Sequence, residues 1–105
     1  MSSSELAQLI GMLRSIELDL AATPEKARAD FSASIGAAPV APDIHFEPLT
    51  LAGRPALASL TPGARPDRTL LYLHGGAFVI GNPTDYRSLS GELGRAAGVR
   101  ALSLD

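Results

Sequence analysis

Hydrophobic residues in the first twenty positions recur at steps of three and four. This spacing places them on one stripe and predicts an amphipathic helix over residues 6–20. The members of the stripe are Leu6, Leu9, Ile10, Leu13, Ile16 and Leu20. Ser3 or Ser4 can cap the start of this helix. Stripes of this kind usually face a protein core, so we expect this one to be buried rather than to bind a membrane or a partner.

A second helix is predicted to begin at the sequence Thr23-Pro24-Glu25. Thr23 can supply the capping oxygen, and Pro24 suits the first helical position, where its missing N–H costs nothing. Glu25 would then interact favourably with the positive end of the helix dipole. We expect this helix to end near Gly36.

Two prolines between residues 37 and 42 forbid a regular helix there and indicate an extended linker. The hydrophobic pattern changes at the same point. We therefore divide the chain into a helical segment over residues 1–38 and a sheet-forming segment over residues 39–105.

The sheet-forming segment opens with two short runs that read as strands. Alternating positions over residues 44–51 predict the first strand, Gly53 marks a turn, and residues 55–60 predict the second. The two strands are expected to form an antiparallel pair.

The remainder of the chain predicts a strand, a loop, a helix and a final strand. Residues 69–73 form a continuous apolar run, as expected of a strand covered on both faces. A helix around residues 86–97 should end at Gly98, and residues 99–104 should form the last strand. A strand, helix and strand in this order form a crossover unit with parallel pairing, which predicts the α/β class.

Composition narrows the kind of protein. The chain has 105 residues, of which 46% are hydrophobic and 19% charged, so it should fold as one small globular unit. Nine basic and eleven acidic residues, with no basic cluster, give little support for nucleic-acid binding. The absence of cysteine excludes disulfides and thiolate metal sites. Neither a signal peptide nor a membrane span is recognisable, so we expect a cytoplasmic protein that binds no membrane.

The candidate chemistry lies in the sequence His74-Gly75-Gly76-Ala77-Phe78, directly after the strand at 69–73. Two successive glycines allow backbone conformations closed to other residues and expose amide N–H groups to a ligand. Such donors stabilise the negative charge that an ester carbonyl oxygen acquires during acyl transfer, and losing one costs on the order of 3–4 kcal/mol. Loops of the His-Gly-Gly-Gly type form oxyanion holes in lipases and esterases. The tripeptide alone, however, favours a simple glycine turn with His74 hydrogen-bonded in the core.

The context of the motif changes that interpretation. The run over residues 70–81, the helix after it and the strand at 99–104 closely resemble the hormone-sensitive-lipase-like family of bacterial esterases. The N-terminal helices also resemble the start of that family's cap, and the strand pair at 44–60 resembles its first strands. The likeness therefore covers the whole chain, although only about a dozen residues around His74 are specific to it.

The resemblance implies an α/β-hydrolase fold and a carboxylesterase that acts on small acyl esters through a Ser-His-Asp triad, without cofactor or metal. It also implies that the N–H groups of Gly75 and Gly76 are the oxyanion donors, with Ala77 as a further candidate. His74 would orient the loop rather than act as a base, and we expect it to be largely buried with its ring nitrogens bonded to nearby backbone. Phe78 would help to wall the substrate pocket.

Two departures from the family pattern are visible. Ala77 stands where a third glycine is common, and its Cβ would narrow the space beside the donors. The sequence contains no Gly-x-Ser-x-Gly elbow, so the nucleophile, the acid and the base of the triad have no counterpart here. His45 matches no catalytic position and is interpreted as structural. The chain is therefore predicted to be the N-terminal portion of such an enzyme and to be inactive alone.

Two other functions remain open. The chain could belong to a noncatalytic binding protein built on an α/β-hydrolase scaffold, or it could be a complete noncatalytic domain. The second is disfavoured because the final strand leaves the sheet uncovered. The expected partners are a small ester substrate and, at the open sheet edge, the remainder of the hydrolase chain or another copy.

Overall fold

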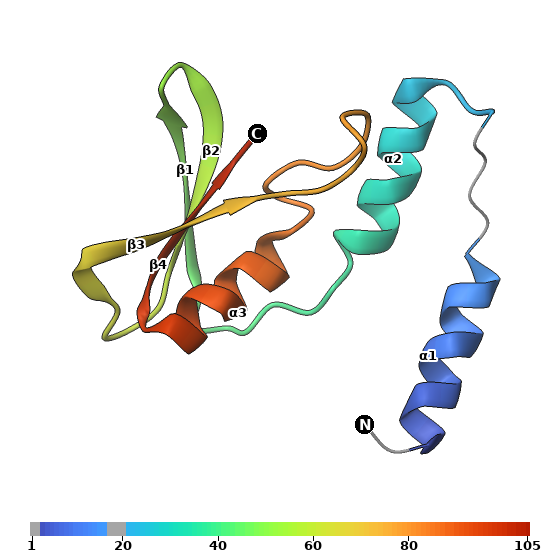
Figure 1. Ribbon diagram of the computed structural model, residues 1–105, viewed down its shortest axis with the longest axis horizontal. Helices are drawn as coiled ribbons and strands as arrows, with labels where there is room; N and C mark the ends of the chain where they lie inside the picture. Colours follow the sequence, from blue (N-terminus) through green and yellow to red (C-terminus); the bar gives the residue numbers. More distant parts are fainter. Residues whose placement is uncertain (1–2, 17–20) are drawn as a thin grey trace.

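The computed structural model describes residues 3–16 and 21–105, which form an α/β structure as predicted (Figure 1). The described helices are α1 (Ser3–Ser15), α2 (Pro24–Ile35) and α3 (Arg87–Ala97). The described strands are β1 (His45–Leu51), β2 (Arg54–Leu60), β3 (Arg65–Leu73) and β4 (Val99–Leu104). The shortest dimension of the molecule is 20 Å, which fits one layer of helix on one sheet.

The strands form one mixed sheet in the order β1-β2-β4-β3. β1 pairs antiparallel with β2, and β2 pairs antiparallel with β4. β3 and β4 are parallel, with Leu73 opposite Leu104, which confirms the predicted crossover through α3. β3 begins at Arg65, earlier than the apolar run indicated, and a register shift separates Arg65 from Thr69.

The predicted helix cap at Thr23, the helix end at Gly98 and the turn at Gly53 all have the expected geometry. Thr23 is extended, and its side-chain oxygen accepts a hydrogen bond from the N–H of Lys26 at 3.3 Å, which caps α2. Gly98 ends α3 in the left-handed conformation, with φ of 69°. Ala52 and Gly53 both have positive φ in the two-residue turn between β1 and β2, as a tight hairpin turn of the favoured hand requires.

The core lies between α3 and one face of the sheet, and small residues bring the two layers together. Ser90 of α3 and Ala101 of β4 are fully buried. A Cβ atom on Gly94 would lie 3.0 Å from the carbonyl oxygen of Val99 and 3.2 Å from the Cβ of Ala101. The helix backbone therefore approaches β4 about as closely as a residue without a side chain allows.

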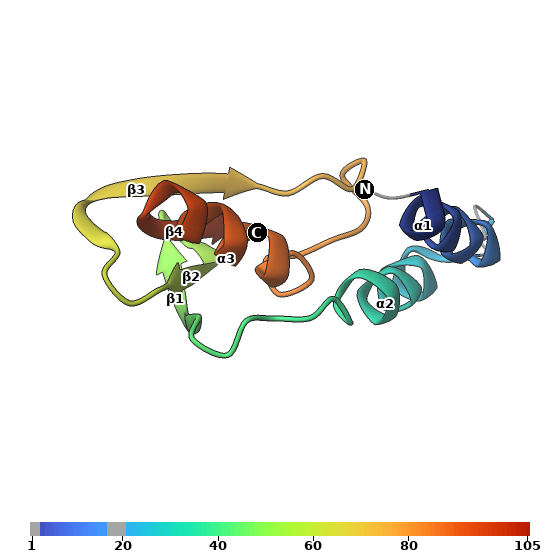
Figure 2. The same cartoon turned by 90° about the horizontal axis from the view of Figure 1, so that it is seen from below.

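The apolar stripe of the first helix is not buried, so the expectation that it faces the core is wrong for this structure. No residue of α1 is buried, and Leu6 and Leu13 are 46% and 55% exposed. The physical reason is position, since α1 lies beyond α2 on the side away from the sheet (Figures 1 and 2). Leu20, the last member of the predicted stripe, lies outside the described residues.

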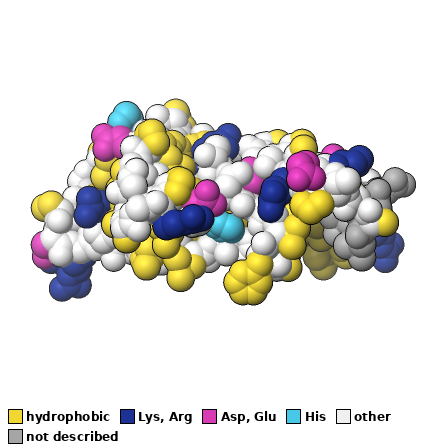
Figure 3. Space-filling view, turned by 90° about the horizontal axis from the view of Figure 1, so that it is seen from above, with side chains coloured by type: hydrophobic (Ala, Val, Ile, Leu, Met, Phe, Trp, Pro, Cys, Tyr) yellow, Lys and Arg dark blue, Asp and Glu magenta, His cyan; other side chains and the backbone are white. Residues whose placement is uncertain are grey.

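β3 was expected to be covered on both faces, and this is also wrong for the described residues. Leu71 is 55% exposed and Leu73 is 65% exposed. The cause is that α3 covers only one face of the sheet, while β3 stands last in the strand order with β4 as its neighbour. On the face drawn in Figure 3, hydrophobic side chains reach the surface along much of the molecule. Within residues 3–16 and 21–105, no helix is long and apolar enough to cross a membrane.

The close approach of α3 to β4 predicts that Gly94→Ala destabilises the sheet layer. Overpacking costs about 1–3 kcal/mol, whereas alanine in a helix gains about 1 kcal/mol over glycine, so the first effect should dominate. We expect the thermal midpoint of the chain to fall by several degrees in a circular dichroism melt. Gly11→Ala in α1 is the matched control, because no atom lies within 4 Å of its added Cβ; that variant should gain helical signal instead. A rise in the midpoint for Gly94→Ala would contradict the packing argument.

Candidate functional site

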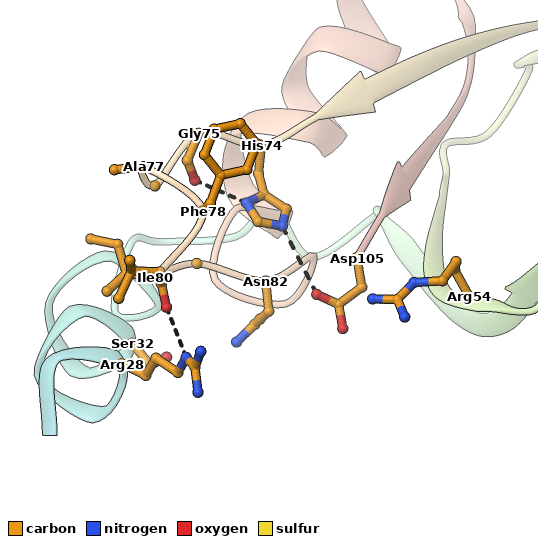
Figure 4. A pocket seen from close by; sticks show the side chains of 13 residues that line it. Arg28, Ser32, Arg54, His74, Gly75, Ala77, Phe78, Ile80, Asn82 and Asp105 are labelled. Carbon is orange, nitrogen blue, oxygen red and sulfur yellow. Dashed lines mark hydrogen bonds and ion pairs between the residues drawn. The ribbon is translucent and has the colours of Figure 1, made fainter. Parts of the chain in front are cut away.

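The candidate site is the turn that follows β3 at the carboxyl end of the strand. A cavity of about 650 Å³ opens beside this turn (Figure 4). Carboxyl ends of parallel strands are the usual position of ligand sites in α/β sheets. The cavity is lined by residues 74–82 and by Arg28, Ser32, Arg54 and Asp105.

Gly76 sets the shape of the turn. It has φ of 142°, and a Cβ atom there would lie 1.8 Å from the carbonyl oxygen of Ile80. The amides of Val79 and Ile80 both donate to the carbonyl oxygen of Gly76 at 3.0 Å, so the turn closes on this one residue. Only glycine fits at this position, whereas a Cβ on Gly75 would meet open space.

The amides of Gly75 and Gly76 are the groups that the sequence singles out as anion donors. Within residues 3–16 and 21–105, neither N–H donates a hydrogen bond to the sheet, to a helix or to a side chain. Both residues line the cavity. The described structure thus leaves two neighbouring backbone donors available beside one cavity.

The backbone is strained at the two residues that follow Gly76. Ala77 and Phe78 have φ of 55° and 63°, in the left-handed region that residues with a side chain adopt at a cost. A glycine would adopt this conformation at Ala77 without that cost. Phe78 lines the cavity, yet its side chain is fully exposed. Its predicted role as a wall of the substrate pocket stays a prediction.

His74 is mostly buried, with 16% of its side chain exposed. Its Nδ1 lies 2.9 Å from the carbonyl oxygen of Gly75, a contact that requires a proton on Nδ1 because a carbonyl only accepts. The expectation that both ring nitrogens bond to backbone needs correction. Nε2 lies instead 4.0 Å from a carboxylate oxygen of Asp105, since β4 ends beside β3 and delivers Asp105 next to the loop.

Tyr86 completes the surroundings of His74, and the sequence reasoning missed it. The two rings stack with centroids 5.6 Å apart and an angle of 15° between their planes. The tyrosine hydroxyl donates to the carbonyl oxygen of Gly75 at 3.4 Å. Burial, followed by the electrostatic influence of Tyr72 and Asp85, raises the pKa of Tyr86 above its usual value. The hydroxyl therefore remains a donor at neutral pH.

Helix α2 brings further groups to the cavity. The Nε of Arg28 donates to the carbonyl oxygen of Val79 at 2.7 Å, and the hydroxyl of Ser32 donates to Asp85 at 2.9 Å. Arg28 and Ser32 are four residues apart, so the sequence could have placed them on one face of a helix. It does not indicate which part of the protein this face contacts. Arg54 and Asn82 also line the cavity without having been predicted.

Two curated proteins, both named as acetyl-hydrolases, are similar to parts of this chain. No family model matches the chain. It is 42% identical over 60 residues to LipR of Mycobacterium tuberculosis, whose name describes an acetyl-hydrolase, and 51% identical over 43 residues to an acetyl-hydrolase of Streptomyces hygroscopicus. These regions cover 57% and 41% of this chain but only 20% and 14% of the relatives.

Solved structures match over the whole chain. An esterase of the bacterial hormone-sensitive lipase family superposes with a TM-score of 0.86 and 38% identity, covering 100% of this chain and 35% of that one. EstE5, in a crystal soaked with p-nitrophenyl butyrate, gives a TM-score of 0.87 and 32% identity, with coverages of 99% and 35%. The chain thus spans about a third of the length of these proteins.

The three helices and the mixed four-stranded sheet of the described residues match the N-terminal part of an α/β-hydrolase fold. Over its whole length, the chain is similar to about a third of the length of esterases of the bacterial hormone-sensitive lipase family.

The contrast between the two glycines yields a direct test of the turn. Gly76→Ala should break the turn, because its Cβ would overlap the carbonyl of Ile80 and its φ of 142° is unfavourable for alanine. We expect the amide resonances of residues 76–81 to move together in a ¹H–¹⁵N spectrum of the chain. Gly75→Ala, with open space around its Cβ, should shift only its immediate neighbours. Equal spectral changes in the two variants would show that the turn has another conformation.

Proposed function

We propose that this chain is the N-terminal portion of a serine carboxylesterase that hydrolyses small acyl esters, and that it contributes the oxyanion-hole loop. The observation that carries the proposal is the pair of amides at Gly75 and Gly76, which lie beside one cavity and donate no hydrogen bond to any described residue. Support comes from relatives named as acetyl-hydrolases and from EstE5, which was soaked with an aryl butyrate ester.

The chemistry of these donors follows from ester hydrolysis. A nucleophile adds to the ester carbonyl, and the carbonyl oxygen acquires a negative charge in the tetrahedral intermediate. Amides fixed in advance at this oxygen stabilise the charge without reorganising during the reaction. The nucleophilic serine, the acid and the base would come from sequence outside these 105 residues.

His74 supports the loop in this proposal rather than transferring protons. Its Nδ1 is engaged with the carbonyl of Gly75, and Nε2 faces Asp105. A general base must instead reach the proton that it removes from the nucleophile. Ala77 remains a further candidate donor, at a backbone conformation that glycine would adopt more easily.

Residues 1–38 are proposed to form part of a cap over the active site. α2 supports this role, because Arg28 and Ser32 line the cavity and Arg28 hydrogen-bonds to the carbonyl oxygen of Val79 in the loop (Figure 4). The free edge of β3 would be covered by the remainder of the hydrolase chain or by another copy. A cytoplasmic location stays a prediction.

The missing triad predicts that the 105-residue chain alone does not hydrolyse p-nitrophenyl acetate or butyrate. Oxyanion donors without a nucleophile cannot form an acyl-enzyme. Nitrophenol release should equal that of an unrelated protein at the same concentration, while the intact protein should turn over both esters. A burst of nitrophenol from the purified chain would contradict this prediction. A folded intact protein without esterase activity would instead favour a noncatalytic binding protein.

Removal of one donor should slow the intact enzyme strongly. Gly76→Pro deletes the Gly76 N–H, so we expect kcat to fall roughly a hundredfold or more. Distortion adds to this loss, because proline cannot adopt the φ of 142° found at Gly76. Gly75→Ala keeps its N–H and has space for its Cβ, so its kcat should stay within severalfold of wild type. A kcat for Gly76→Pro close to that of wild type would remove Gly76 from the oxyanion hole.

A further inference from the structure

Tyr86 lies where three parts of the fold meet. It immediately precedes α3. The centroid of its ring lies 5.9 Å from that of Phe31 in α2 and 5.9 Å from that of Tyr72 in β3. On its remaining side it meets the candidate loop, by stacking on His74 and by donating to the Gly75 carbonyl. A ring held among three elements is a rigid support for whatever it contacts.

The end of the loop returns to the same place. A Cβ on Gly81 would lie 2.9 Å from the Gly75 carbonyl oxygen, 3.0 Å from the Nδ1 of His74 and 3.1 Å from the Cε2 of Tyr86. Gly81 has φ of 92°, so its conformation also favours glycine. Tyr86, His74 and Gly81 therefore all lie next to one atom, the carbonyl oxygen of Gly75.

That carbonyl oxygen has a direct geometric link to a candidate donor. The C=O of Gly75 and the N–H of Gly76 belong to one planar peptide unit, and in a trans peptide they point in opposite directions. Fixing the direction of the carbonyl therefore fixes the direction of the Gly76 N–H. Two donors, the Nδ1 of His74 and the hydroxyl of Tyr86, converge on this carbonyl.

We propose that Tyr86 is a positioning residue that aims the Gly76 amide into the oxyanion hole by holding the carbonyl of the same peptide unit and the ring of His74. This inference rests on the proposed esterase function for its effect on catalysis. The geometry itself does not depend on that function. The two parts can therefore be tested separately.

The first test measures geometry in the 105-residue chain by NMR. Tyr86→Leu removes both the stacked ring and the hydroxyl, so we expect shifts of the Gly76 amide and of the His74 ring protons. Tyr86→Phe keeps the ring and should move mainly the Gly76 amide. Tyr72→Phe is the matched control, because it removes a hydroxyl from the neighbouring ring of the same cluster, and within the described residues no hydrogen bond joins that hydroxyl to the loop. It should leave the Gly76 amide in place.

The second test measures catalysis in the intact enzyme with p-nitrophenyl butyrate. Misaiming a donor harms the transition state more than the bound substrate, so kcat should fall while KM changes little. We expect a loss in kcat of roughly two- to fivefold for Tyr86→Phe, which lacks one weak hydrogen bond. For Tyr86→Leu the loss should be about ten- to a hundredfold, because small displacements of reacting groups are costly. Tyr72→Phe should keep the wild-type kcat.

The outcomes separate the two ideas. Unchanged Gly76 and His74 resonances in Tyr86→Leu would overturn the positioning role, as would equal effects of Tyr86→Phe and Tyr72→Phe. If Tyr86→Leu does not fold, the comparison of Tyr86→Phe with Tyr72→Phe still shows whether the Tyr86 hydroxyl positions the Gly76 amide. A wild-type intact protein that hydrolyses no ester would refute the proposed function, while the NMR result would still show whether Tyr86 aims the amide.

Discussion

β3 and β4 run parallel and side by side, so their carboxyl ends meet at one edge of the sheet. Parallel pairing requires the chain between them to cross over, and α3 makes that crossing. The same pairing places Asp105 beside His74, because Leu104 lies opposite Leu73. It also starts α3 next to the loop, which brings Tyr86 against the Gly75 carbonyl. The approach of Asp105 to His74 and of Tyr86 to Gly75 thus both depend on this strand pairing.

Local sequence signals predicted the parts of the fold that local physics determines. The Thr23 cap depends on a hydroxyl three positions before the N–H that it accepts from, and Gly98 on a backbone conformation that glycine adopts freely. The crossover followed from the order of elements and a strong handedness rule. The glycine pair after β3 was correctly placed at the sheet edge for the same reason.

What the sequence could not predict depends on which surfaces meet. The spacing of the apolar residues in α1 shows that they share a face, but not whether another element reaches that face. The run in β3 does not reveal that α3 covers one side only. Asp105 could have been placed beside His74 from the strand register alone. Tyr86 could not, because its contacts depend on the path of the loop and on α2 as well as α3.

The isolation of α1 divides the chain into parts of unequal local stability. A helix of 13 residues with no buried side chain is marginal in water, since helices of this length depend on tertiary contacts. The strands β2 and β4 are held by hydrogen bonds on both edges and by the buried face of α3. Amide protons in α1 should therefore exchange with solvent through local fraying, while those of β4 should exchange only when the sheet opens as a whole. For this chain, secondary structure and protection from exchange are thus separate properties.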